Sequence, residues 1–329
     1  MARTARYTLA AFITALLLAP PAAARSAGTD SIPLTPRPHM DDATLNLYNR
    51  IRTAKGLLLG LGELFAPPVP RQRWEPRYAP SIERWKQLYG ERLPACYEFE
   101  MGEANRPQAV REWEEAKRYA DLGGIVWLQL SLNNFTVPYG GRRERMVAGG
   151  MNDRSNGLVP VLPGGYAHEK FASAMRQLTR EIKDFGRPCV LRPFHEMNGR
   201  WFWWGAQPKE FKVLWRWVFD LFQQEGVHNV IWCWAPSANT PRGPDYYPGD
   251  DMVDIIGTSQ YFDNGGLPDD VMTGLKELAR LGPDKPLWLA ELGPLARVDF
   301  WLNAHAEFAR VPRLRGFNLW LARGWNAWA

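Results

Sequence analysis

Eight apolar runs of strand length recur along the chain, and segments with helical periodicity lie between several of them. The runs are residues 56–61, 94–100, 124–130, 188–193, 229–235, 254–260, 286–290 and 316–321. Continuous apolar strands that alternate with helices indicate a parallel sheet buried on both faces. No glycine-rich phosphate-binding loop follows the first run, so an open dinucleotide-binding sheet is disfavoured. The pattern predicts an α/β fold of the closed (β/α)8 TIM-barrel class.

Helices are predicted where apolar residues recur every three or four positions. One such stripe runs through residues 171–185 and stops at Gly186, and Pro208 and Pro268 open two others. A shorter amphipathic segment, residues 43–54, precedes the first strand. Few residues follow the last strand, so the outer helix usual at that place is missing. Whether the segment 43–54 covers that gap is left open by the sequence.

The N-terminal segment has the pattern of a cleaved secretory signal. Arg3 and Arg6 precede an apolar stretch over residues 7–18, and small residues follow at Ala22 and Ala24. The stretch is shorter than the ~20 residues that a membrane-spanning helix needs. We therefore expect a secreted or periplasmic protein without a membrane span. The predicted organisation is a signal peptide (1–24), a proline-rich lead-in (25–42) and one barrel domain (43–329).

Composition excludes several classes of partner and ligand. The chain of 329 residues has a net charge of only +5, and its densest basic run, Arg142 to Arg145, is interrupted by Glu144. Nucleic acid is therefore not an expected partner, and a monomer is expected. The chain contains three cysteines, which all lie in apolar runs and are predicted to be buried free thiols: Cys96, Cys189 and Cys233.

Two glutamates lie where a barrel places its functional residues. Glu196 follows the fourth apolar run and Glu291 ends the seventh, and barrel active sites form at the carboxyl ends of the strands. A pair of carboxyl groups across a sugar can protonate the leaving oxygen and stabilise or attack the anomeric carbon. Either glutamate alone could equally make a surface salt bridge. Together they predict glycosidic bond hydrolysis.

An aromatic-rich segment surrounds the first of these acids. Trp201, Phe202, Trp203 and Trp204 follow Glu196, and Gly199 and Gly205 bracket them. These glycines predict a loop, so the aromatic residues are expected to line a cleft where rings stack on sugars. His195 and Glu196 lack the second histidine of a His-Glu-x-x-His zinc site, because position 199 is glycine. We therefore expect no metal and no cofactor.

These motifs resemble those of glycoside hydrolase family 26. The family includes endo-β-1,4-mannanases, β-1,3-xylanases and mixed-linkage β-glucanases. The resemblance spans residues 56–320 and is strongest in the second half, in the segments 195–204, 232–237, 246–250, 253–257 and 290–293.

The resemblance implies a retaining mechanism with Glu196 as acid/base and Glu291 as nucleophile. The expected activity is endo-acting hydrolysis of a β-linked polysaccharide, with β-1,4-mannan as the first candidate. The same chemistry on another β-glycan (mixed-linkage β-glucan, β-1,3-xylan or a bacterial exopolysaccharide) is the alternative. A barrel that binds glycan without catalysis is a third hypothesis.

Further substrate-binding residues follow from the same resemblance. His195 is similar to a histidine near the nucleophile and the sugar, and Tyr261 to a tyrosine that supports the nucleophile. Trp201 resembles the platform on the leaving-group side, and Trp320 the one under the reacting sugar. The alternatives are packing roles: a core histidine, loop packing for Tyr261 and barrel core for Trp320. Arg192 could orient a carboxylate or form an internal ion pair.

The chain departs from the family pattern at two places. Family members commonly have Ser-Trp-His after strand three, whereas this chain has Ser131, Leu132 and Asn133. Asn133 can donate and accept hydrogen bonds but cannot be cationic. An arginine often follows the strand-eight tryptophan, where this chain has Leu321. Both departures concern mannan specificity. The long glycine-rich loop, residues 137–165, is expected to shape the cleft.

Overall fold

The structure is a computed structural model that describes residues 37–61, 93–101, 109–130, 132–138, 150–261, 274–293, 308 and 311–319. The predicted signal peptide, Trp320, Leu321 and residues 139–149 of the glycine-rich loop lie outside these residues. No helix among the described residues is long and apolar enough to cross a membrane.

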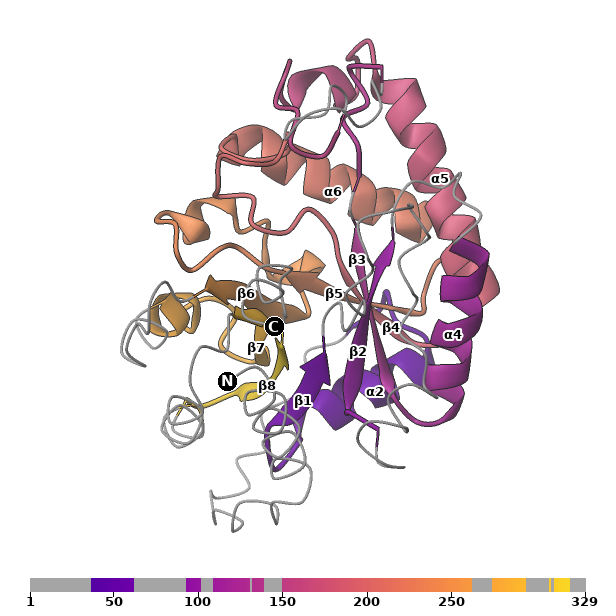
Figure 1. Ribbon diagram of the computed structural model, residues 1–329, viewed down its shortest axis with the longest axis vertical. Helices are drawn as coiled ribbons and strands as arrows, with labels where there is room; N and C mark the ends of the chain where they lie inside the picture. Colours follow the sequence, from indigo (N-terminus) through magenta and orange to yellow (C-terminus); the bar gives the residue numbers. More distant parts are fainter. Residues whose placement is uncertain are drawn as a thin grey trace, which may run out of the picture.

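Eight parallel strands form a closed barrel in sequence order (Figure 1). Each strand pairs with the next, and β8 pairs with β1. The strands are β1 (Leu58–Leu61), β2 (Cys96–Met101), β3 (Ile125–Leu130), β4 (Cys189–Arg192), β5 (Val230–Trp234), β6 (Ile255–Tyr261), β7 (Leu287–Gly293) and β8 (Leu314–Leu319). All eight predicted strands and the predicted fold class are confirmed.

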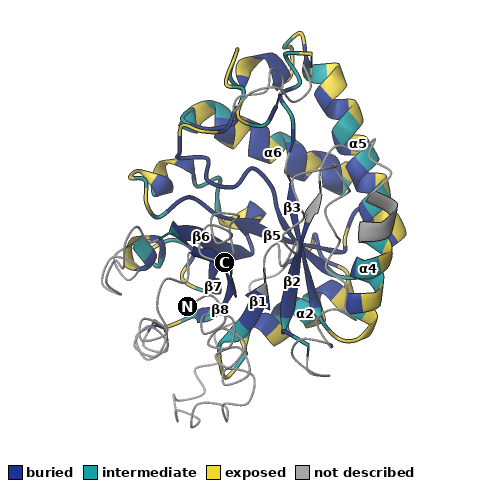
Figure 2. Cartoon of the chain, viewed as in Figure 1, coloured by how far each residue is buried: buried dark blue, intermediate teal, exposed yellow. Residues whose placement is uncertain are grey.

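Amphipathic helices pack on the outside of the barrel. They are α4 (Ala109–Asp121), α5 (His168–Phe185) and α6 (Pro208–Gln224). Gly186 ends α5 in the left-handed region, with φ 63°, where glycine meets no Cβ clash. Each helix turns a buried face inward and an exposed face to solvent (Figure 2). Of the helix predicted to start at Pro268, residues 274–278 are described and helical.

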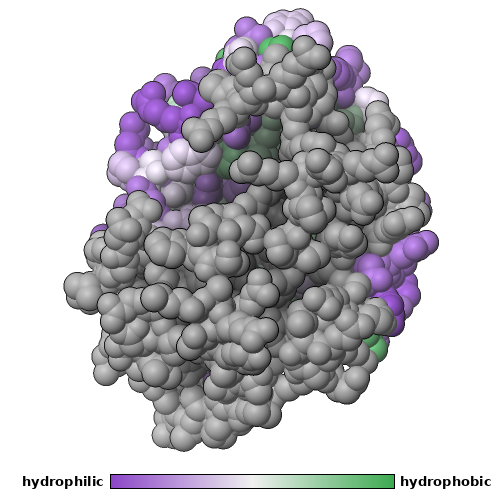
Figure 3. Space-filling model, in the orientation of Figure 1, coloured by the Kyte–Doolittle hydropathy of each residue, from purple (hydrophilic) through white to green (hydrophobic). Residues whose placement is uncertain are grey.

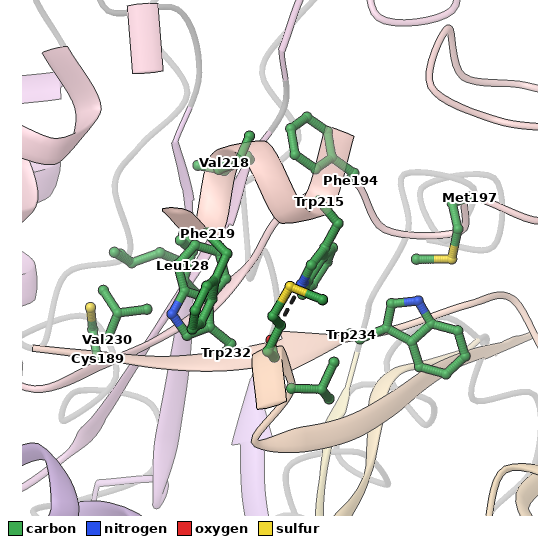
Figure 4. Packing of buried hydrophobic residues seen from close by; sticks show 14 of the residues in the cluster. Leu128, Cys189, Phe194, Met197, Trp215, Val218, Phe219, Val230, Trp232 and Trp234 are labelled. Carbon is green, nitrogen blue, oxygen red and sulfur yellow. Dashed lines mark hydrogen bonds between the residues drawn. The ribbon is translucent and has the colours of Figure 1, made fainter. Parts of the chain in front are cut away.

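The pleat of the strands separates two apolar cores. Residues that point outward pack against the helices; Trp232 of β5, for example, lies 5.2 Å from Phe219 and 5.9 Å from Trp215 of α6 (ring centroids, Figure 4). Residues that point inward fill the lower half of the barrel, among them Ile125, Val190, Ile231, Ile255 and Trp288. The three cysteines are buried and free, as predicted.

A helix closes the N-terminal end of the barrel. The segment α2 (Asp42–Arg52) crosses beneath the strands (Figure 1), and Tyr48 and Ile51 join the inner core. Asp41 N donates to His228 O at 2.9 Å, before β5, and Arg315 Nε on β8 donates to Arg52 O at 2.6 Å. The apolar side of this segment therefore faces the barrel interior, whereas the residues that follow β8 lie outside the described residues.

The residues just before α2 are anchored by a buried carboxylate. Asp254 precedes β6 and lies 3.4 Å from Arg37 Nε and 3.1 Å from His39 Nε2. Its Oδ2 also accepts a hydrogen bond of 2.8 Å from Trp232 N. Residues 37–41, which the sequence places in the lead-in, are thus tied to the bottom of the barrel.

We expect Ile51→Ala to lower the free energy of unfolding by about 2–5 kcal/mol, the usual cost of truncating a large buried side chain. Ile51 is fully buried against the inner core. Asn46→Ala, on the exposed side of the same helix, should change stability by less than about 0.5 kcal/mol. Urea unfolding of both variants measures this. Equal effects would contradict the closing role of α2.

Candidate active site

The loop after β4 holds Glu196 in an unusual backbone conformation. Phe194 and Glu196 have φ values of 50° and 54°, a backbone region that residues other than glycine rarely adopt. The backbone N–H of Glu196 donates to Ala235 O at 2.8 Å, which ties this loop to the end of β5. Strain of this kind persists only where neighbouring contacts fix the chain, and it clusters at functional sites.

Two side chains of the loop fix its position. Asn198 Nδ2 donates to Ser237 O at 2.9 Å and to Thr240 O at 2.7 Å, and Asn198 Oδ1 accepts from Ser237 N at 2.8 Å. Trp204 Nε1 donates to His195 O at 2.8 Å. The β4 loop is therefore clamped both to the β5 loop and to itself.

An extra residue in β7 turns Glu291 into the barrel. Thr258 of β6 pairs with Leu289, but the next residue, Ser259, pairs with Glu291, so Ala290 is bulged out of the register. The same irregularity appears against β8. Side chains alternate along a strand, and one extra residue reverses the alternation beyond it. Ala290 and Glu291 consequently both face the interior.

Arg192, at the end of β4, connects Glu291 to the barrel interior. Its guanidinium is fully buried, and its Nη2 donates to Glu291 Oε1 at 2.7 Å. The same guanidinium contacts Glu98 of β2 and Gln129 of β3. Arg192 thus does both things considered for it: it contacts a catalytic candidate and forms an internal ion pair.

Two other predicted residues lie beside Glu291. The Tyr261 hydroxyl donates to Glu291 Oε2, so the two oxygens of this carboxyl group have different donors. His195 is buried, with Nε2 3.9 Å from Glu291 Oε1. Burial and the nearby Arg192 charge keep the pKa of His195 well below its usual value, so its ring is neutral at neutral pH.

Glu196 is in a different environment. The residue is only 8% exposed, and its Oε2 accepts a hydrogen bond of 2.7 Å from Trp201 Nε1. Burial raises the pKa of Glu196 to about 7, and the charge of Glu291 adds to the rise, whereas the Trp201 donor and Arg192 oppose it. A carboxyl group with this pKa still carries its proton in a large share of molecules near neutral pH.

The aromatic segment divides between core and surface. Trp203 and Trp204 are buried in the outer core, and Phe202 stacks on Trp204 with centroids 4.6 Å apart. Only Trp201 is substantially exposed, at 39%. The expectation that the whole segment lines a cleft is therefore wrong for Trp203 and Trp204. A Cβ on Gly205 would lie 2.4 Å from the backbone oxygen of Gly199, so the loop folds back closely on itself at this glycine.

The glycine-rich loop joins this site through its described part. Trp203 N donates to Met151 O at 3.2 Å, and Leu158 N donates to Gln207 Oε1 at 3.0 Å. Asn133, which precedes this loop, is half-buried. Hydrophilic residues predominate among the described residues on the face shown in Figure 3. Trp320, the predicted platform, lies outside the described residues.

Sequence reasoning missed three polar residues of the barrel interior: Glu98, Gln129 and Asn318. Each is buried at an inward position of β2, β3 or β8 and belongs to the network around Arg192. Buried charged residues are rare unless they are paired. A polar residue inside an otherwise apolar strand was the available signal.

The geometry defines a class of site. The pKa of Glu196 is raised to about 7, while Glu291 accepts hydrogen bonds on both oxygens. Two carboxyl groups at the carboxyl ends of the barrel strands are the groups that glycoside hydrolases use. No group of three or more metal-binding side chains occurs among the described residues.

The chain belongs to glycosyl hydrolase family 26, whose family model matches residues 87–305. It is 29% identical over 215 residues to a mannan endo-1,4-beta-mannosidase of Bacillus subtilis, covering 61% of this chain and 57% of that protein. A mannan endo-1,4-beta-mannosidase of Thermothelomyces thermophilus is 27% identical over 275 residues, covering 78% of this chain and 55% of that one. The chain thus spans little more than half the length of these relatives.

The fold is shared with solved structures. A GH26 beta-mannanase from Bacteroides ovatus superposes with a TM-score of 0.69 at 23% identity, covering 85% of each chain. At this identity the likeness concerns the fold.

We expect the wild type to lose stability as the pH rises, and Glu196→Gln to show no such loss. The pKa of Glu196 is raised from 4.5 to about 7 on folding, so between these values the folded state binds the proton more tightly than the unfolded state. The stabilisation is complete below about pH 4.5 and is lost as the pH passes 7. The effect should reach about 3 kcal/mol.

Denaturant unfolding at pH 4.5 and pH 8 gives this difference for both proteins. Glu277→Gln is the control, because Glu277 is exposed on the helical segment 274–278. If Glu196→Gln and Glu277→Gln depended on pH alike, the raised pKa would be refuted.

Proposed function

We propose that this protein is a retaining, endo-acting hydrolase of a β-linked polysaccharide, with β-1,4-mannan as substrate. The observation that carries the proposal is the contrast between two buried carboxyl groups. Glu196 is buried beside the indole of Trp201 and has a raised pKa. Glu291 instead accepts hydrogen bonds from Arg192 and Tyr261. Family membership and the relatives named as mannan endo-1,4-beta-mannosidases support it.

In the proposed reaction, Glu291 attacks the anomeric carbon while Glu196 gives its proton to the leaving glycosidic oxygen. The glycosidic C–O bond breaks as the bond to Glu291 forms, which leaves a covalent glycosyl-enzyme and an ionised Glu196. Glu196 then takes a proton from water, and the resulting hydroxide equivalent attacks the same carbon and releases Glu291. Two displacements at one carbon retain its configuration.

Other side chains would bind and orient the sugar. Neutral His195, beside Glu291, offers a ring nitrogen to the reacting sugar, and exposed Trp201 offers an aromatic face on the leaving-group side. We assign Trp320 to the platform under the reacting sugar by family resemblance. Tyr261 and Arg192 hold the two oxygens of Glu291 in place, so that the attacking atom meets the substrate in a fixed orientation.

We further propose that the enzyme acts outside the cytoplasm, as a secreted or periplasmic monomer, since residues 1–24 have the pattern of a signal peptide. Its partner is the polysaccharide itself, and the two carboxyl groups supply the proposed chemistry without a cofactor.

A panel of polysaccharides tests the substrate and the stereochemistry. We expect reducing sugar to be released fastest from mannan and galactomannan, and slower or not at all from mixed-linkage β-glucan, β-1,3-xylan and carboxymethyl cellulose. Proton NMR should show the β-anomer first. A different preferred glycan would support the alternative substrate, an inverted product would refute the mechanism, and binding without hydrolysis would indicate a non-catalytic barrel.

Variants of the two carboxyl groups test which glutamate is the acid/base and which is the nucleophile. With Glu291→Ala, azide should attack an activated β-glycoside directly and give an α-configured product. With Glu196→Ala, a good leaving group should still allow the covalent intermediate, and azide should then give a β-configured product. Each variant should lose several orders of magnitude on polymer. Identical anomers from both variants would refute the assigned roles.

We expect Asn133→His to change substrate preference more than stability. Asn133 is half-buried beside the described part of the glycine-rich loop, and a histidine there would restore the residue common in the family. The measurement is the ratio of kcat/KM on mannan to that on mixed-linkage β-glucan, with the melting temperature of each variant. Equal losses on every glycan together with a lower melting temperature would contradict a role in specificity.

A further inference from the structure

A second buried acid lies beneath the proposed nucleophile. Glu98 points inward from β2, and only 3% of the residue is exposed. Its Oε1 accepts from Arg192 Nε at 3.1 Å and also contacts Nη2 of the same guanidinium. Since Nη2 also donates to Glu291 Oε1 and contacts Gln129 Oε1, one guanidinium nitrogen is shared among Glu98, Glu291 and Gln129.

The position of Glu98 is fixed from the opposite side. Asn318 Nδ2 on β8 donates to Glu98 Oε2 at 3.3 Å. The Oδ1 of Asn318 accepts from Trp288 Nε1 at 3.1 Å and from Cys96 Sγ at 3.7 Å. These two donors require oxygen on that side, so the Asn318 amide must present its N–H to Glu98.

The barrel makes room for this contact at a glycine. A Cβ on Gly60 of β1 would lie 2.0 Å from Asn318 Oδ1. A larger residue there would displace the amide and release the second oxygen of Glu98. Contacts from β8, β7 and β1 therefore hold Glu98 in one place, with its charge directed at Arg192.

We propose that Glu98 is a positioning residue for the nucleophile Glu291, acting through Arg192. Glu98 orients the guanidinium and compensates part of its charge, so that Arg192 holds Glu291 without binding it too tightly for attack. This inference rests on the proposed function.

The charges around Arg192 determine the direction of the expected effect. Glu98, Glu291 and Glu196 surround the guanidinium, with neutral His195 and the hydroxyl of Tyr261 beside Glu291. The thiol of Cys233 lies near Arg192 and that of Cys96 near Glu98, and burial raises the pKa values of both thiols so that they stay uncharged. Removing the charge of Glu98 would leave the charge of Arg192 less compensated, and Arg192 would then favour the anionic form of Glu196 more strongly.

Glu98→Gln tests the proposal, because it removes the charge and keeps the shape. We expect kcat on the preferred glycan to fall at least tenfold with little change in KM. The alkaline limb of the activity profile against pH, which reports the loss of the Glu196 proton, should move to lower pH by on the order of one unit. Glu98→Asp keeps the charge but moves it by one methylene, so kcat should fall while the alkaline limb stays in place.

Asp254→Asn is the matched control. Asp254 is also a fully buried carboxylate, but it pairs with Arg37 and His39 at the opposite end of the barrel. This variant should lose stability and keep the wild-type pH profile. An unshifted alkaline limb in Glu98→Gln, or an equal shift in Asp254→Asn, would overturn the proposal. If Glu98→Gln does not fold, an unchanged kcat in Glu98→Asp would overturn it as well.

One further measurement needs no activity. The wild type should lose stability between about pH 4.5 and 7, as Glu196 loses its proton. In Glu98→Gln this loss should be complete at a lower pH. If the wild type hydrolyses none of the glycans, the proposed function fails, but this unfolding measurement still decides whether Glu98 controls the field of Arg192. An unchanged window would then reject the inference separately.

Discussion

The buried guanidinium of Arg192 is the constraint on which the upper half of the barrel depends. A cation removed from water loses several kcal/mol of solvation unless charges and hydrogen bonds replace it. Glu98, Gln129 and Glu291 supply that replacement from three other strands. The polar layer at the carboxyl ends of the strands is therefore one electrostatic unit, and Glu291 belongs to it.

The lower half of the barrel stabilises a site that is itself strained. The site contains a glutamate whose backbone has a positive φ, as well as several buried charges, and both features lower stability. The apolar inner core lies below them, and α2 closes it from the other side. Burial of apolar surface there offsets what the polar layer costs. The division also places rigid packing directly beneath the catalytic candidates.

Elements with a local sequence pattern could be predicted from the sequence. Side-chain directions and contacts that depend on how the strands pair could not. All eight strands follow from apolar runs, and the positions of Glu196 and Glu291 follow from the ends of those runs. The inward direction of Glu291, however, depends on the bulge at Ala290, which appears only when β7 is paired with β6. The prediction that Trp203 and Trp204 line a cleft is wrong, because a loop bracketed by glycines can still fold into the core. Glu98 and Asn318 were missed because their partner, Arg192, comes from a distant strand.

The two glutamates differ because their donors differ. Glu291 accepts from Arg192 on one oxygen and from Tyr261 on the other, so both of its oxygens are occupied as acceptors. Glu196 accepts from the neutral indole of Trp201 on one oxygen, and burial then favours its protonated form. The negative charge of Glu291 adds to that preference. The two glutamates, identical as side chains, thus lie in different environments: charged and hydroxyl donors surround Glu291, whereas burial and the Glu291 charge raise the pKa of Glu196.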